Sequence, residues 1–223
     1  DNRFLLEGTF RVDGSSKFDP EVRWGFFPSV SAGWKIHNEE FLKNIYNVDE
    51  IKLRLSYTQT GIDANVGNTA FQYLSGFSEL AQVYYLDRAT PTTQIRTTGL
   101  ANPLITWEET TLYNVGVDFG LFQGKVYGNV DVFYRYRDGL LRRPIEGLPS
   151  TFGANLPFFN LDSRSDRGFE FLVGYQANIG KLKLDVSGNF TYARQRYENY
   201  QENIDFDDPN QVRIDRNSNQ WVN

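Results

Sequence analysis

The sequence contains no cysteine and no methionine, and among its 223 residues it has a single histidine, His37. Without cysteine the chain has no disulfide framework, no thiolate metal site and no cysteine nucleophile. A lone histidine cannot form a catalytic triad, which needs a nucleophile, a base and an orienting group together. No glycine-rich phosphate loop is present either. We therefore expect no enzyme activity and no cofactor.

A basic stripe and a long apolar run are also missing. The chain has 23 basic and 28 acidic side chains, which gives a formal net charge of −5. Nucleic-acid binding needs clustered positive charge to neutralise phosphates, so nucleic acid is a poor partner. The longest uninterrupted apolar run covers only residues 83–86, whereas a membrane-spanning helix needs about 20 apolar residues. A helical membrane protein is excluded.

Aromatic residues are abundant, at 16% of the chain, and they favour half-buried β-strands. Apolar residues alternate with polar ones in seven segments, as in Phe4, Leu6 and Phe10 with Arg3, Glu7 and Thr9 between them. The segments are 4–12, 28–36, 51–58, 111–121, 125–137, 168–179 and 182–192. None of the apolar-face positions is charged, although 23% of the chain is. The pattern predicts seven two-faced strands.

The connections between these strands alternate between short and long. Residues 122–124 and 180–181 are tight turns, and the second, which begins with glycine, fits a type II′ hairpin turn. Long loops rich in Gly, Asn, Asp, Ser and Pro cover 13–25, 59–110, 138–167 and the stretch after 193. Between the second and third strands, residues 38–46 have an Asn cap, early acids and apolar spacing that predict a short amphipathic helix.

One further pattern concerns the ends of the strands. The apolar-face residues nearest the long loops are mostly aromatic. They are Phe10, Tyr57, Tyr113, Tyr134, Tyr136, Phe169 and Tyr192. Aromatic girdles of this kind lie at the interfaces of outer-membrane barrels. The strands, at about 9 to 13 residues, also exceed the usual length of about 5 to 6 and approach the 9 to 11 that cross a bilayer.

These features predict an all-β fold: a partial transmembrane antiparallel β-barrel with long loops on one side and short turns on the other. An open sheet in lipid would leave unsatisfied backbone groups at both edges, so seven strands must be part of a larger barrel. A soluble carbohydrate-binding β-sandwich also hides one face of each strand and stays as the alternative.

Several sequence runs carry a family resemblance. They are Arg11-Val12-Asp13-Gly14-Ser15-Ser16-Lys17-Phe18, Phe27-Pro28-Ser29-Val30-Ser31-Ala32-Gly33-Trp34, Asn38-Glu39-Glu40-Phe41-Leu42, residues 51–61, Asn102-Pro103 with Thr106-Trp107-Glu108, and residues 114–118. In this order they resemble the C-terminal barrel half of SusC/RagA-like TonB-dependent outer-membrane transporters of the Bacteroidota, over about residues 1–192.

The resemblance implies a multi-pass barrel of about 22 strands in the cell outer membrane. It also implies an N-terminal plug, a segment that contacts TonB, and import of oligosaccharides or peptides with a SusD-like surface lipoprotein as a lid. Residues 1–223 would then be a fragment of one barrel domain, a wall segment with extracellular loops, from which plug and TonB-contacting segment are absent. A SusC-like barrel acting as a scaffold in an outer-membrane complex is a further alternative.

Several residues are candidates for contact with substrate or partner. The aromatics of the longest loop could stack on sugars, pack against the lipoprotein, or form the loop's own small core; they are Phe71, Tyr73, Phe77, Tyr84 and Tyr85. The acidic segment Asp205-Phe206-Asp207-Asp208 with Asn210 could bind calcium, although its spacing misses the EF-hand loop.

Other motif residues are expected to be structural. Asp13-Gly14-Ser15-Ser16 is interpreted as a turn in which Gly14 takes positive φ, and Trp107-Glu108 as an anchor for the end of the longest loop. The polar face mixes acids and bases, which indicates a mixed polar lumen. Its charged residues include Glu7, Asp118, Asp131, Glu170, Asp185, Arg3, Arg11, Arg54, Arg135 and Arg137.

Overall fold

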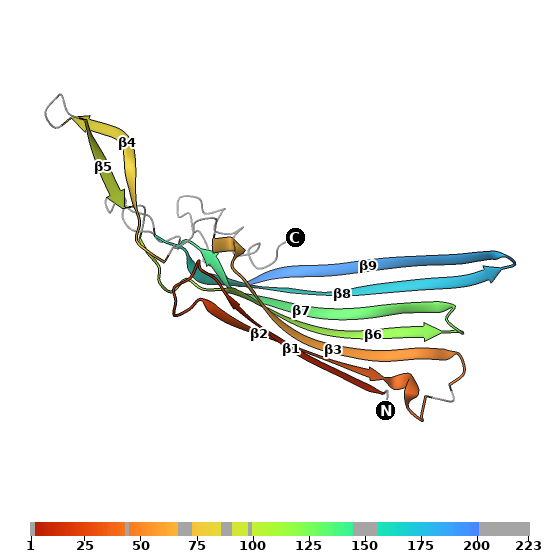
Figure 1. Cartoon of the computed structure of the whole chain (residues 1–223). Coiled ribbons are helices and arrows are strands. Elements are labelled where there is room, and N and C mark those ends of the chain that lie inside the picture. The colour runs from red at the N-terminus through yellow and green to blue at the C-terminus, as the bar shows by residue number, and fades with distance from the viewer. Residues whose placement is uncertain are drawn as a thin grey trace, which may run out of the picture.

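The computed structural model describes residues 3–42, 45–66, 73–85, 91–97, 100–144 and 156–200. These residues form one seven-stranded antiparallel sheet in the order β1-β2-β3-β6-β7-β8-β9, with a separate hairpin of β4 and β5. The strands are β1 (Phe4–Gly14), β2 (Trp24–Lys35), β3 (Val48–Ile62), β4 (Phe77–Tyr85), β5 (Pro91–Thr97), β6 (Glu108–Leu121), β7 (Val126–Arg142), β8 (Phe159–Ile179) and β9 (Leu182–Asn199). Figure 1 shows the seven strands side by side in a single curved layer.

All seven predicted strands are confirmed, and each of them extends further toward the long loops than predicted. β8 begins at Phe159 and β9 ends at Asn199. Near the start of β8 the sequence 162–166 is polar on both faces, so the apolar alternation that marks a strand is lost there. The predicted long loop over 59–110 contains two strands that were not predicted, because β4 and β5 pair within it.

The register places the seven apolar faces on one side of the sheet. Leu55 pairs with Val115, Val115 with Val132, and Val132 with Phe169, so one apolar row crosses four strands. We call this the outer face and the opposite one the inner face. Outer-face side chains are widely exposed, with Leu6 at 82% and Phe10 at 73%. No second layer covers the outer face within the described residues, which rules against the sandwich.

At the short-turn end the predicted helix over 38–46 is wrong for its described residues, 38–42 and 45–46. The structure has a 3₁₀-helix η1 (Ile36–Asn38), and the following turns are closed by i→i+3 hydrogen bonds such as Leu42 N to Glu39 O at 3.0 Å. Glu39, expected as a helix-start acid, instead accepts hydrogen bonds from Trp34 Nε1 (3.0 Å) and Arg3 (3.3 Å). Because these contacts tie Glu39 to β1 and β2, it is drawn away from an α-helical first turn.

The two predicted tight turns are confirmed. Between β6 and β7, Phe122, Gln123 and Gly124 have φ of 60°, 62° and 74°. Between β8 and β9, Gly180 has φ of 64° and Lys181 does not have a positive φ, as a type II′ turn requires. His37 also lies on the short-turn side, where its Nδ1 is 3.1 Å from Ile51 O. It therefore has a structural position next to β3.

Candidate functional site: the loop bases and the inner face

The apolar core of the described residues lies at the long-loop end of the sheet. We call it the loop-base cluster; its buried members are Phe18, Phe27, Val66, Ile105 and Trp107. The Trp107 ring lies 5.2 Å from the Phe18 ring and 5.5 Å from the Phe27 ring, both edge-on. Its Nε1 donates to Arg23 O at 3.1 Å. Trp107 therefore fastens the end of the β3–β6 loop to the β1–β2 loop, as predicted.

Two polar side chains beside this cluster hold a third loop. Asn160 accepts a hydrogen bond from Thr106 N (3.0 Å) and donates to Thr106 O (3.0 Å) and Gly139 O (2.7 Å). Glu108, buried, accepts from Leu141 N at 2.9 Å. Buried polar groups with full sets of partners fix one arrangement of the chain. The bases of the β3–β6 and β7–β8 loops are thus locked together.

The predicted turn at residues 13–16 has a wider role than closing β1 onto β2. Ser15 Oγ donates to Asp63 Oδ2 at 2.8 Å, and Lys17 Nζ donates to Asp63 O at 2.9 Å. Gly14 does not take the positive φ that glycine permits. An added Cβ would lie 2.8 Å from the Trp24 ring, so the exposed ring would have to shift to accept a side chain there. The motif ties the first loop to the start of the longest one.

The predicted contact aromatics are only partly placed. Tyr73 packs against the loop-base cluster, and Phe77 opens β4 with 71% of its surface exposed. Tyr84 and Tyr85 belong to β4, but their side chains lie outside the described residues. Phe71 lies outside them altogether. Tyr73 therefore lies beside a cluster that the longest loop shares with the β1–β2 loop, and the contact role of all five aromatics stays a prediction.

The acidic segment 205–210 also lies outside the described residues, so calcium binding there stays a prediction. In the part of the chain that the structure describes, His, Asp and Glu do not gather into a group of three that could hold a metal ion. None of its helices is long and apolar enough to cross a membrane.

The middle of the inner face carries an ion network. Arg54 donates from Nε to both Asp118 oxygens (2.9 and 3.0 Å) and from Nη2 to Asp131 Oδ2 at 3.0 Å, while Lys52 Nζ lies 3.6 Å from Asp118. Gly116 makes room for it, because an added Cβ would lie 2.8 Å from Arg54 Nη2. Two bases and two acids therefore neutralise one another.

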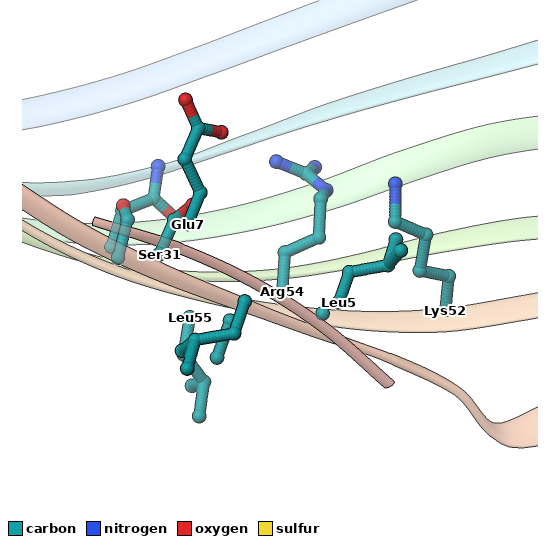
Figure 2. Close-up of a pocket in the computed structure, with 11 residues that line it drawn as sticks. Leu5, Glu7, Ser31, Lys52, Arg54 and Leu55 are labelled. Atoms are coloured by element: carbon teal, nitrogen blue, oxygen red, sulfur yellow. The ribbon is translucent and has the colours of Figure 1, made fainter. Parts of the chain in front are cut away.

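Figure 2 shows how the sheet separates its two faces at this level. Glu7, Arg54 and Lys52 point to one side and Leu55 to the other, around a hollow of about 620 Å³. Further inner-face bases pair with acids toward both ends of the strands: Arg3 with Glu39, Arg11 with Asp13, Arg135 with Asp166 and Arg142 with Asp162. The predicted mixed polar face is confirmed.

The aromatic row of the outer face is confirmed by the register. Tyr57 pairs with Tyr113 and Tyr113 with Tyr134, with ring centroids 5.3 and 6.5 Å apart. Phe169 and Tyr192 form a second cross-strand pair at 5.8 Å. The rings therefore continue across the sheet at the long-loop border of the apolar surface.

The apolar surface crosses the strands obliquely. One register row joins Val30, Tyr57, Tyr113, Tyr134, Arg167 and Arg194. On β2 the apolar run extends from Trp24, six residues beyond this row toward the loops, to Trp34, four residues below it. On β9 the run extends from Tyr192, two residues below the row, to Leu182, twelve residues below it. We call this oblique surface the apolar band.

The slope of the band gives the inclination of the strands. Both borders descend by eight residues over the five strand-to-strand steps from β2 to β9. At about 3.3 Å per residue and 4.8 Å between strands, the strands incline by about 45° to the band. Strands of outer-membrane barrels tilt by about 35–45° to the barrel axis. The chain therefore has the geometry of the wall of a tilted β-barrel.

Comparison with known proteins identifies the family within that class. The family model for the TonB dependent receptor-like β-barrel matches residues 1–221, and the chain belongs to this family. It is 35% identical over 195 residues to the TonB-dependent receptor SusC of Bacteroides thetaiotaomicron. It is 32% identical over 202 residues to the TonB-dependent receptor P39 of Formosa agariphila.

The fold is likewise similar to solved structures. The RagAB peptide importer in its closed-closed state superposes with a TM-score of 0.76 at 21% identity, over 92% of this chain and 21% of that one. The same importer in its open-open state superposes with a TM-score of 0.74. The matched part is 86% of this chain for both SusC and P39, but only 19% and 17% of those proteins. The chain therefore corresponds to about a fifth of such a receptor.

Proposed function

We propose that this chain forms part of the wall of an outer-membrane TonB-dependent transporter that imports oligosaccharides or peptides with a SusD-like surface lipoprotein. The observation that carries the proposal is the oblique apolar band on a one-layer sheet whose other face is charged. A planar bilayer cuts tilted strands at an angle, so a lipid-facing surface must cross the register rows in this way.

The width of the band supports the same proposal. On β8 it runs from Phe169 to Ile179, eleven residues. At about 3.3 Å per residue and a tilt of about 45°, this segment covers roughly 23 Å along the barrel axis, close to the apolar height of about 25 Å in such barrels. Arg167 and Arg194 follow where the band ends on the loop side. Charge begins where we expect the headgroups.

The edges of the sheet support a place in a larger barrel. β1 and β9 each have one neighbour in the described sheet. In hydrocarbon each unpaired backbone N–H or C=O would cost several kcal/mol, so strands from the rest of the receptor must pair with both edges. Plug and TonB-contacting segment would lie elsewhere in that receptor, and residues 1–223 would be wall and loops only.

The loop-base cluster supports a role for the loops in capture of substrate and partner. The cluster and the polar contacts beside it join the bases of three long loops through Trp107, Asn160 and Asp63. Binding residues are often carried on loops that a rigid scaffold positions. The RagAB structures are described as a peptide importer and SusC as a TonB-dependent receptor. A SusD-like lipoprotein seated on these loops is the partner that we propose.

Uptake by the intact receptor tests the proposal. Cells with and without the receptor would be given labelled maltooligosaccharides and labelled peptides, with and without a protonophore that removes the energy TonB delivers. We expect receptor-dependent uptake of one ligand class that the protonophore abolishes. The scaffold alternative would be favoured if uptake of neither ligand class depends on a receptor that is present at normal levels. It would be favoured further if cells without the receptor lose other proteins from an outer-membrane complex.

A further inference from the structure

Two arginines lie directly opposite each other on the inner face near the long loops. Arg137 of β7 and Arg164 of β8 are register partners. Side chains directly opposite on one face have Cβ atoms about 5 Å apart, and like charges in this position destabilise a sheet. An anion between the two guanidinium groups would remove this repulsion.

Neither arginine has an acidic partner among the described residues. Arg3, Arg11, Arg54, Arg135 and Arg142 each pair with a carboxylate. Arg164 instead donates from Nε to the amide oxygen of Gln195 at 2.9 Å, once that amide is turned with its oxygen toward Arg164. Arg137 Nε is buried and has no hydrogen-bond partner. This pair therefore differs from the other inner-face arginines.

The charges of the described residues around the pair do not compensate it. The charged groups that face Arg137 are Arg164, Arg135, Asp166 and Glu108. Asp166 is the partner of Arg135 at 4.0 Å, and Glu108 accepts a hydrogen bond from Leu141 N. Both acids are therefore engaged elsewhere, which leaves a local excess of positive charge.

The pair also lies where a substrate would arrive. Its register row is Thr110, Arg137, Arg164 and Tyr197, on the loop side of the Arg54 network. Both arginines are half-buried, so their donors are partly shielded from water. A guanidinium group presents planar, paired donors that match the oxygens of a carboxylate or sulfate.

We propose that Arg137 and Arg164 form a subsite that binds an oxyanion, a carboxylate or a sulfate, on the transported substrate. The inference rests on the proposed transport function and adds to it the charge of the substrate. One oxyanion between the two guanidinium groups removes their repulsion and supplies acceptors to Arg137. Arg54, with two carboxylates already bound, is the matched position that does not bind the substrate.

Protection from chemical modification tests the subsite. The intact receptor in detergent would be treated with phenylglyoxal, which reacts with arginine, in sodium sulfate or in sodium chloride of equal ionic strength. Mass spectrometry would give the modification rate of each arginine. We expect sulfate to slow modification of Arg137 and Arg164 at least threefold and to leave Arg54 unchanged. Equal rates in both salts at the pair would overturn the proposal.

A variant and matched ligands extend the test. Arg164→Gln should remove sulfate protection from Arg137, and Arg54→Gln should leave it intact. The wild type should bind oligogalacturonate at least tenfold more tightly than its methyl ester, or a peptide with a free C-terminus more tightly than its amide. Arg164→Gln should abolish that preference. Whether the saccharides or the peptides show the preference identifies the ligand class. Uptake that proceeds without any charge preference would overturn the subsite and leave the transport function standing.

Discussion

The loop-base cluster and the apolar band lie in one chain but differ in how far that chain covers their apolar side chains. In the cluster Trp107 is 9% exposed and Phe18 is fully covered by the chain itself. In the band Trp24 is 68% exposed and packs against no second layer in the described residues. A protein interior is close-packed and responds to every lost atom, whereas lipid fills vacated space. The same substitution should therefore have different effects in the two regions.

The largest effect is expected from Trp107→Ala. It removes a ring packed against Phe18 and Phe27 and the hydrogen bond to Arg23 O. Loss of a buried aromatic side chain costs about 3–5 kcal/mol. The thermal unfolding midpoint of the intact receptor and protease cleavage of its loops would report the change. Trp24→Ala, on the band, is the control and should lower the midpoint far less; equal losses would contradict the distinction between the regions.

The second prediction places a charge on each face of β6. Val117→Arg puts arginine in the band, and a charge near the bilayer midplane costs about 2–4 kcal/mol. Asn114→Arg puts it on the inner face, beside the hollow of Figure 2, and should cost little. The measurement is the fraction of receptor folded into lipid vesicles across a urea series. Leu55→Arg and Ser56→Arg repeat the comparison on β3, and equal tolerance within both pairs would count against lipid as the environment of the band.

The third prediction concerns polar contacts in the cluster. Asn160→Ala leaves the carbonyls of Thr106 and Gly139 and the amide of Thr106 without their partner. Unsatisfied buried groups cost about 1–3 kcal/mol. Hydrogen exchange at the Thr106 amide should quicken in the intact receptor. Asn199→Ala removes one exposed hydrogen bond to Leu161 O and serves as the control; unchanged exchange at Thr106 in Asn160→Ala would show that the loop bases are held by other contacts.

The strands could be predicted best where apolar and polar residues alternate strictly and all apolar residues lie on one face. Segments such as 111–121 and 182–192 could be identified as strands because each apolar face is uninterrupted and free of charge. The β4–β5 hairpin could not, because segments 77–85 and 91–97 show no sustained alternation of apolar and polar residues. The helix over 38–46 failed because Glu39 bonds across to Arg3 and Trp34, contacts that depend on the register.

The candidate site was predictable to a smaller extent, for a related reason. Trp107 could be expected to anchor a loop, since it stands at the loop's end beside a strand. The opposition of Arg137 and Arg164 depends on which residue of β8 faces which residue of β7, across the long loop that joins these strands. The charge of each residue is visible in the sequence, but their pairing is set by the register and by the irregularity that follows Arg137.

The smallest effects are expected from two glycine substitutions at positions where an added side chain would contact none of the described residues. Gly180 and Gly188 both have open space where a Cβ would be added, but only Gly180 has positive φ, at 64°. Gly180→Ala should therefore lower stability by about 1 kcal/mol through backbone strain alone. Gly188→Ala should be neutral or raise stability by up to about 1 kcal/mol, because alanine restricts the unfolded chain. Unfolding midpoints of the two receptors would separate these effects. A loss at Gly188 as large as that at Gly180 would mean that a neighbouring strand packs closely on the outer face of β9, and that packing there is not left to lipid.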